Sequence, residues 1–161
     1  MVIYATPSLT RFTSTFPMVR SIQTKVKRVI FARMDPGEDV LKSIEKVAKE
    51  HDVKSGQLSL IGAVSKAKLG YFDRKGVEYK DFTVDEDVEV VSCIGNISTH
   101  DGNIVVHAHM IVADEAGKCW GGHLMAGCMV SVTIELVIIE TEIELIRKRD
   151  DVTGLNLLHI D

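Results

Sequence analysis

The feature that most constrains the fold is a series of short apolar runs separated by tight turns, which fills the chain from residue 56 onward. Three four-residue turns contain glycine near their end: "DRKG" at 73–76, "HDGN" at 100–103 and "DEAG" at 114–117. Connections this short join antiparallel neighbours, whereas parallel strands need much longer crossovers. The pattern predicts a large, mostly antiparallel β-sheet, with strands near 25–32, 56–69, 77–82, 88–98, 103–112, 118–120 and 129–145.

Residues 35–50 follow a different period. Val40, Ile44 and Val47 recur at helical spacing, and acidic residues gather before them, where they oppose the positive end of a helix dipole. We expect a helix over about 38–50. A chain of 161 residues is long enough for one ordinary core. The predicted fold is therefore α+β, a single domain with one main helix packed on the sheet.

The strand predicted over 130–142 is apolar on both faces. One face carries Val130, Val132, Ile134, Leu136 and Ile138, and the other begins polar and becomes apolar again near its end. A strand that is apolar on both faces must be covered on both. Because only one helix is predicted, we expect a subunit interface to provide the second cover.

The N-terminal segment differs from the rest of the chain. Residues 1–34 contain no acidic side chain and are interspersed with Lys and Arg, a composition weakly similar to a transit peptide. The alternative is an extended tail before a domain whose pattern starts near Ser21. We take residues 1–20 as an N-terminal extension and 21–161 as the domain.

Composition restricts location and partners. The three cysteines lack paired short spacings, so a disulfide framework is disfavoured and a reducing, cytoplasmic location is expected. Charged or polar residues interrupt every apolar run, and none is long enough to span a membrane. The net charge of −4 indicates no general nucleic-acid surface. Phosphate-loop, dinucleotide-binding and nucleophile-elbow motifs are absent from the sequence.

Three histidines stand in surroundings that otherwise resemble core. His107 and His109 alternate along a predicted strand, so both point to the face opposite Ala108 and Met110. After the turn at 114–117 the chain returns to His123, preceded by Gly121 and Gly122, which allow a bend or a close backbone approach.

Three imidazoles can hold zinc or another divalent transition metal and leave one coordination position open. Glu89 and Glu135 are candidate bases or partners of the ligands. Histidines on a half-buried strand can equally serve as structural hydrogen-bonding residues, and the sequence leaves both interpretations open.

The segments that carry these residues resemble the plants-and-prokaryotes-conserved (PPC) domain family. The similarity lies in "SGQLSLIGAVSKAKLGYFD" at 55–73, "EVVSCIGNIS" at 89–98, "HAHMIVADEAGKCWGGHLMAG" at 107–127 and "RKRDDVTGLNLL" at 147–158. The resemblance implies a compact α+β domain that assembles as a homotrimer and a DNA-associated regulatory or binding module.

Two departures from the plant members favour another role. The Arg-Gly-Arg-Pro core of the AT-hook is absent, and residues 86–90 read "EDVEV" where plant members carry a Gly-Arg-Phe-Glu-Ile region. Stand-alone prokaryotic-type members tend to keep the histidines. The resemblance therefore implies a metal or small-ligand role for His107, His109 and His123, as a binder or a metal-dependent enzyme, more strongly than DNA recognition. A purely structural trimer is the third hypothesis.

Overall fold

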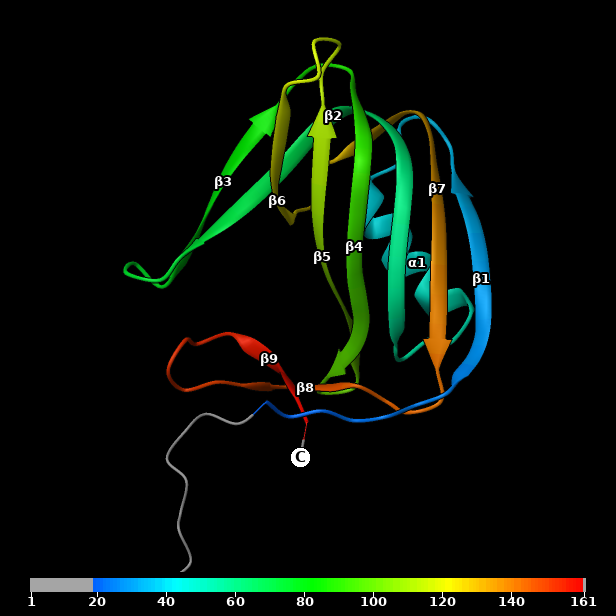
Figure 1. Ribbon diagram of the computed structural model, residues 1–161, viewed down its shortest axis with the longest axis vertical. Helices are drawn as coiled ribbons and strands as arrows, with labels where there is room; N and C mark the ends of the chain where they lie inside the picture. Colours follow the sequence, from blue (N-terminus) through cyan, green and yellow to red (C-terminus); the bar gives the residue numbers. More distant parts are fainter. Residues whose placement is uncertain (1–18, 161) are drawn as a thin grey trace, which may run out of the picture.

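A computed structural model describes residues 19–160 and shows one curved sheet with one helix in that part of the chain (Figure 1). The elements are β1 Val26–Met34, α1 Val40–Glu50, β2 Gly56–Asp73, β3 Glu78–Val84, β4 Val88–His100, β5 Asn103–Ala113, β6 Cys119–Leu124, β7 Met129–Thr141, β8 Ile146–Arg149 and β9 Asn156–His159. The α+β prediction is confirmed, and the three predicted turns join β2 to β3, β4 to β5 and β5 to β6.

The strand pairings close a ring within the sheet. Strand β2 pairs with β4, β4 with β5 and β5 with β6, and β6 returns to the far half of β2. Strands β7 and β1 extend the sheet from the other side of β2. Among the described strands every pairing is antiparallel except the short contact of β4 with β8. The prediction of a mostly antiparallel sheet is therefore confirmed.

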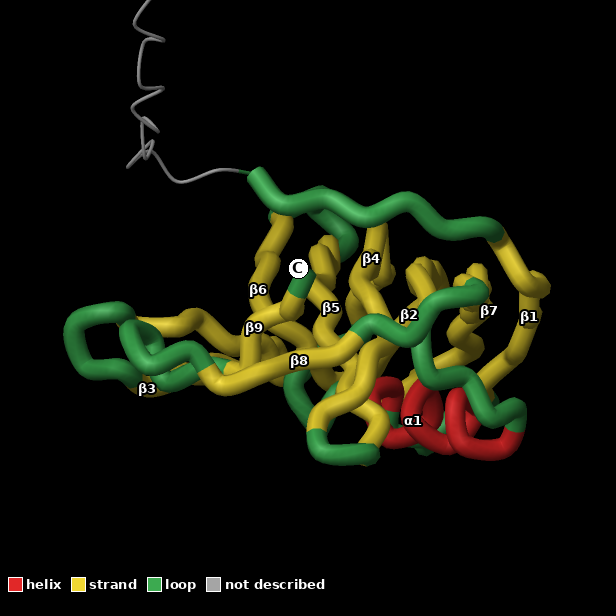
Figure 2. Tube along the Cα trace, turned by 90° about the horizontal axis from the view of Figure 1, so that it is seen from below, coloured by secondary structure: helices red, strands yellow, loops and turns green. Residues whose placement is uncertain are grey.

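Helix α1 covers one face of the sheet. Val40, Ile44 and Ala48 are fully buried along its inner side, as its periodicity predicts. Asp39 caps the helix by accepting a hydrogen bond from the Lys42 backbone N–H at 3.1 Å, and its second carboxylate oxygen accepts one from the Gly127 N–H at 2.7 Å. The cap thus ties the start of the helix to the loop between β6 and β7. Figure 2 shows the helix on one side of the strands and the segment that leads into β1 on the other.

One residue of the predicted core face lies outside the core. Val132 is 69% exposed, whereas Ile134, Leu136 and Ile138 are buried as expected. The pairing of β7 with β2 shifts register beside Gly62, because three residues of β7, 131–133, stand opposite one residue of β2. Such a bulge ends the strict alternation of a strand. The prediction for Val132 is therefore wrong, and the bulge is the reason.

The face of the sheet opposite α1, which we call the outer face, exposes large apolar side chains on β1, β2, β4 and β5. These side chains belong to Val29, Phe31, Ile61, Ile94 and Ile111. No second helix covers them in the described part of the chain. The expectation that a subunit interface covers this face remains a prediction.

The C-terminal part of the sheet was not expected from the sequence. The strand predicted to run to residue 145 ends at Thr141, and a β8–β9 hairpin follows it below the ends of the central strands (Figure 1). This hairpin begins "IRKR", which has too little apolar alternation to predict a strand. No helix in the described region is long and apolar enough to cross a membrane.

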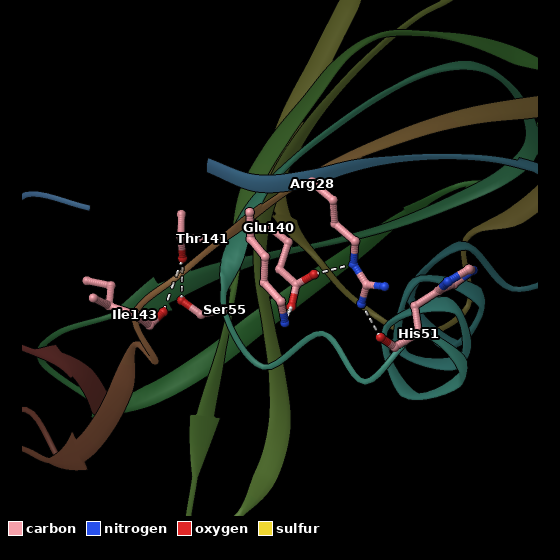
Figure 3. Close-up of polar contacts among 7 residues, drawn as sticks. Arg28, His51, Ser55, Glu140, Thr141 and Ile143 are labelled. Carbon is pink, nitrogen blue, oxygen red and sulfur yellow. Dashed lines mark hydrogen bonds and ion pairs between the residues drawn. The ribbon is translucent and has the colours of Figure 1, made fainter. Parts of the chain in front are cut away.

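Glu140 is a buried carboxylate near the end of β7. It is 3% exposed and accepts hydrogen bonds from Lys27 Nζ, at 2.9 Å, and from Arg28 Nε. Figure 3 shows Arg28 bridging Glu140 and the backbone carbonyl of His51 at the end of α1. Burial opposes ionisation of Glu140, but the two cations outweigh it, so the pKa of Glu140 lies below its ordinary value.

Candidate metal centre

The sheet register brings the three predicted histidines together on the outer face. His107 and His109 lie on β5 with their side chains on the side opposite buried Ala108 and Met110. His123 lies on β6 directly across from His109. Cross-strand partners on one face of an antiparallel pair have adjacent side chains. The local alternation and the β5–β6 pairing together therefore build the cluster.

The geometry of the cluster suits a single ion. One ring nitrogen from each histidine lies within 4.8 Å of the other two. The ring centroids are separated by 5.4 Å for His107 and His109, 5.2 Å for His107 and His123, and 5.5 Å for His109 and His123. Zinc binds imidazole nitrogen at about 2.0–2.1 Å, so two ligands of a tetrahedral ion lie about 3.3 Å apart. Binding would draw the three rings closer together around the ion.

The protonation states of His107 and His123 also suit metal ligands. Burial lowers the pKa of His123 to about 4, with further contributions from His107, His109 and Arg147. Burial likewise lowers the pKa of His107, assisted by the charges of Arg147 and His109. Both rings are therefore neutral at pH 7 and can offer a lone pair.

Gly122 permits the close approach that brings His123 to the cluster. A Cβ at this position would lie 2.8 Å from the Gly70 carbonyl oxygen and 3.1 Å from the Leu69 Cβ. The space beside Gly121 is less tight, because the nearest atom there is Ile111 Cγ1 at 3.3 Å. Both glycines lie inside β6 and not at a bend. Glycine is thus needed at position 122 for the close approach of β6 to β2, and not for a bend.

Grooves open on both sides of the histidines. A groove of about 550 Å³ is lined by His107 and His109 together with residues of β2, β4, the end of β7 and the β7–β8 connection: Gly56, Gln57, Ile94, Gly95, Asn96, Thr141 and Leu145. A smaller groove of about 290 Å³ lies beside His109 and His123, where Tyr79 of β3 packs on the His123 ring with centroids 5.0 Å apart. Within a single chain the cluster is therefore reachable from the outer face.

The two predicted acidic partners are not at this site. Glu89 pairs with Ala113 of β5, four residues along the strand from His109 and thus about 13 Å from it. It lines a different groove, with Asp114 and Glu115. Glu135 lies on β7 opposite Arg33 and Ile61. The structure does not support the prediction for either residue. The sequence alone does not show which residues of neighbouring strands lie opposite one another, so it could not place these carboxylates.

Arg147 is the neighbour that the sequence did not indicate. Its side chain, 7% exposed, donates hydrogen bonds to Ser98 Oγ at 2.8 Å, Asn96 Oδ1 at 2.8 Å and the Asn156 carbonyl oxygen at 2.9 Å. Asn96 is in turn the cross-strand partner of His107. Arg147 stands in the charged run "RKRDD", which is typical of a solvated surface, so no sequence signal distinguishes it.

Comparison with known protein families gives a match over most of the chain. The model of the Plants and Prokaryotes Conserved (PCC) domain matches residues 21–142. Among curated proteins, a bifunctional protein GlmU from Synechococcus sp. strain JA-3-3Ab is 35% identical over 136 residues, which are 83% of this chain and 21% of that protein. The chain thus spans about a fifth of the length of this relative.

Solved structures share the fold. A metal-containing protein from Archaeoglobus fulgidus is 29% identical with a TM-score of 0.80, over 88% of this chain and 99% of that one. A plant- and prokaryote-conserved protein from Pyrococcus horikoshii is 30% identical with a TM-score of 0.80, over 88% and 97%. A presumed DNA-binding protein from Ralstonia eutropha JMP134 is 25% identical with a TM-score of 0.74, over 81% and 90%.

Proposed function

The chain belongs to the Plants and Prokaryotes Conserved domain family, and we propose that it binds a divalent transition-metal ion, zinc in the first instance, through His107, His109 and His123. The observation that carries the proposal is the convergence of three ring nitrogens within 4.8 Å of one another. Two of the rings are neutral at pH 7, which is the state that binds metal. A fold neighbour at 29% identity is described as metal-containing, and this supports the same interpretation.

The donor set fits an open site better than a closed structural one. Structural zinc sites have four protein ligands, and the cluster within the described residues supplies three. A divalent ion held there would supply Lewis acidity to a further group bound at the open position. The groove beside His107 and His109 gives such a group access. This arrangement supports a small-ligand binder or a metal-dependent enzyme.

We propose further that the outer face is covered by other copies of the chain in a homotrimer. The exposed apolar side chains of β1, β2, β4 and β5 on this face support the assembly. The three cysteines are free, which supports the proposal of a reducing, cytoplasmic location. The measured mass of the protein in solution tests the trimer: a monomer at micromolar concentration would contradict it.

A DNA-associated role is the second candidate, because the Ralstonia neighbour is described as presumed DNA-binding. Three basic residues of strand β1, which are candidates for contact with phosphate groups, are paired with carboxylates of this chain. Lys27 and Arg28 pair with Glu140, and Arg33 pairs with Asp35 at 2.9 Å. Binding of a labelled duplex, measured at low and rising salt, tests this role. Retention that weakens steeply with salt supports it, and no binding at low salt rejects it.

The metal proposal is tested by titrating metal-stripped protein with Zn²⁺ against a chromogenic chelator. We expect one ion per chain in the wild-type protein. In His109→Ala the affinity should fall by more than about 100-fold, beyond the range typical of outer partners of a ligand. His51→Ala is the matched control, because His51 is an exposed histidine at the end of α1 and should leave the affinity unchanged. Equal affinity in His109→Ala and His51→Ala would reject the site.

A further inference from the structure

Arg147 is a buried cation whose hydrogen-bond partners are all neutral. A hydroxyl, an amide side chain and a backbone carbonyl accept its three hydrogen bonds. No carboxylate of the described residues lies within ion-pair distance of it, although Glu140, which is buried to a similar degree, has two cationic partners. Burying a charge without a counter-charge is costly, and guanidinium remains protonated even when buried. Among the described residues, the site therefore holds a positive charge without a counter-charge.

The guanidinium lies beside the proposed metal ligands. Its Nη2 donates to Asn96, and Asn96 faces His107 across the β4–β5 pair. Guanidinium has five N–H groups, of which three are engaged within the described residues. The other two N–H groups have no acceptor among the described residues. Arg147 lies behind Asn96, which lines the groove beside His107 and His109.

A bound divalent ion would add two positive charges to this region. Imidazoles bind a metal ion as neutral ligands, and no carboxylate of the described residues belongs to the cluster. Like charges repel more strongly near a partly desolvated surface than in water. An anionic ligand at the open position would offset both the ion and Arg147.

We propose that the groove beside His107 and His109 binds a small organic carboxylate, whose negative charge is stabilised by Arg147 and by the proposed metal ion. This inference rests on the proposed metal site and names its ligand class. The walls contributed by Gly56, Ile94, Gly95 and Leu145 are apolar, so they suit a hydrocarbon body. The arrangement therefore favours an organic carboxylate over a fully hydrated inorganic anion.

The test uses full-length protein loaded with Co²⁺, whose visible absorption reports on its ligands. Co²⁺ uptake is measured first, and absence of uptake would overturn the metal site together with this inference. The loaded protein is then titrated with butyrate, its neutral analogue butyramide and the shorter acetate. We expect saturable spectral changes with butyrate and none with butyramide. Butyrate should bind more tightly than acetate, by roughly fourfold for each buried methylene.

Two variants test the part of Arg147. In Arg147→Gln, butyrate affinity should fall several-fold, because a positive charge close to the groove is removed. Co²⁺ affinity should stay equal or rise, because a neighbouring positive charge is removed. A purely structural role would lower both affinities. Arg147→Lys, which keeps the charge, should retain most of the butyrate binding.

Arg149→Gln is the matched control, since it removes an exposed arginine from the same strand, β8, and should leave butyrate binding unchanged. Should Arg147→Gln fail to fold, Asn96→Asp provides the second variant. It places a carboxylate beside Arg147 and should weaken butyrate binding several-fold. Equal binding of butyrate and butyramide, or wild-type butyrate affinity in Asn96→Asp and in any folded Arg147→Gln, would overturn the inference.

Discussion

Glu140, near the end of β7, and Arg147, on β8, are both buried charged residues, but their surroundings differ. Glu140 is neutralised by two cations from β1, and Arg147 contacts only neutral groups. The first charge is compensated within the chain and joins β1 to β7. The second lies beside the histidine cluster and remains uncompensated among the described residues. The buried charge of Glu140 thus has a structural role, and the buried charge of Arg147 supports the proposed ligand site.

The largest expected effect is the stabilisation of the folded chain by Zn²⁺, which should depend on the histidines beside Arg147 and not on Glu140. Zn²⁺ at about 100 times its Kd should raise the unfolding free energy by about 2.7 kcal/mol, because the ion binds the folded chain. His107→Ala should abolish this increase, and Glu140→Gln should retain it. Urea denaturation with and without Zn²⁺ measures both. An equal increase in His107→Ala would remove the distinction between the regions.

The next effect concerns stability in the absence of metal. Glu140→Gln leaves Lys27 and Arg28 without their carboxylate and should lower the unfolding free energy by about 1–2 kcal/mol. The loss is smaller than for a fully buried pair, because the two cationic side chains are 54% and 43% exposed and can be solvated.

Glu135→Gln provides the control for this measurement, because it changes an exposed carboxylate on the same strand. Its unfolding free energy should stay within about 0.5 kcal/mol of the wild-type value. A loss in Glu135→Gln as large as in Glu140→Gln would show that the pairing of Glu140 is not the cause.

In metal-stripped protein, the unfolding free energy should fall with falling pH over two separate pH ranges, which we call windows. Burial, with neighbouring charges, lowers the pKa of His123 from 6.5 to about 4. Between these values the unfolded chain binds the extra proton, so the unfolding free energy falls as pH falls from 6.5 towards 4. The pKa of Glu140 lies below its ordinary 4.5, so its stabilising effect is lost only as pH falls below that value.

Variants assign the windows when urea denaturation is measured at pH about 7, 5 and 4. His123→Ala should flatten the profile between 6.5 and 4, and Glu140→Gln should flatten it below 4.5. His107 contributes to the first window in the same direction, because burial also lowers its pKa. An unchanged profile in His123→Ala would contradict the assignment.

The smallest effect on Zn²⁺ affinity is expected for the two carboxylates that the sequence suggests as partners of the histidines. Glu89→Gln and Glu135→Gln should each change Zn²⁺ affinity by less than about twofold, because neither residue lies at the cluster. The chelator competition assay measures this. A tenfold loss in either variant would place that carboxylate in the site after all.

Much of the fold could be predicted because its signals are local. The helix over 38–50 is observed as Val40–Glu50, and the turns at 100–103 and 114–117 join the expected strands. The prediction for Val132 is wrong because the bulge arises where β7 pairs with β2. The sequence of one strand gives no information about that pairing. The β8–β9 hairpin was missed because it is held by polar contacts and not by apolar alternation.

The sequence by itself determined that His107 and His109 share a face opposite the core, because side-chain direction alternates along a single strand. It also determined the hairpin that returns His123 towards them. Only the tertiary structure decided that His123 pairs with His109 and that Arg147 reaches Asn96. Strand register and hairpin docking depend on contacts between distant parts of the chain. For that reason the histidines could be named in advance, and the buried charge beside them could not.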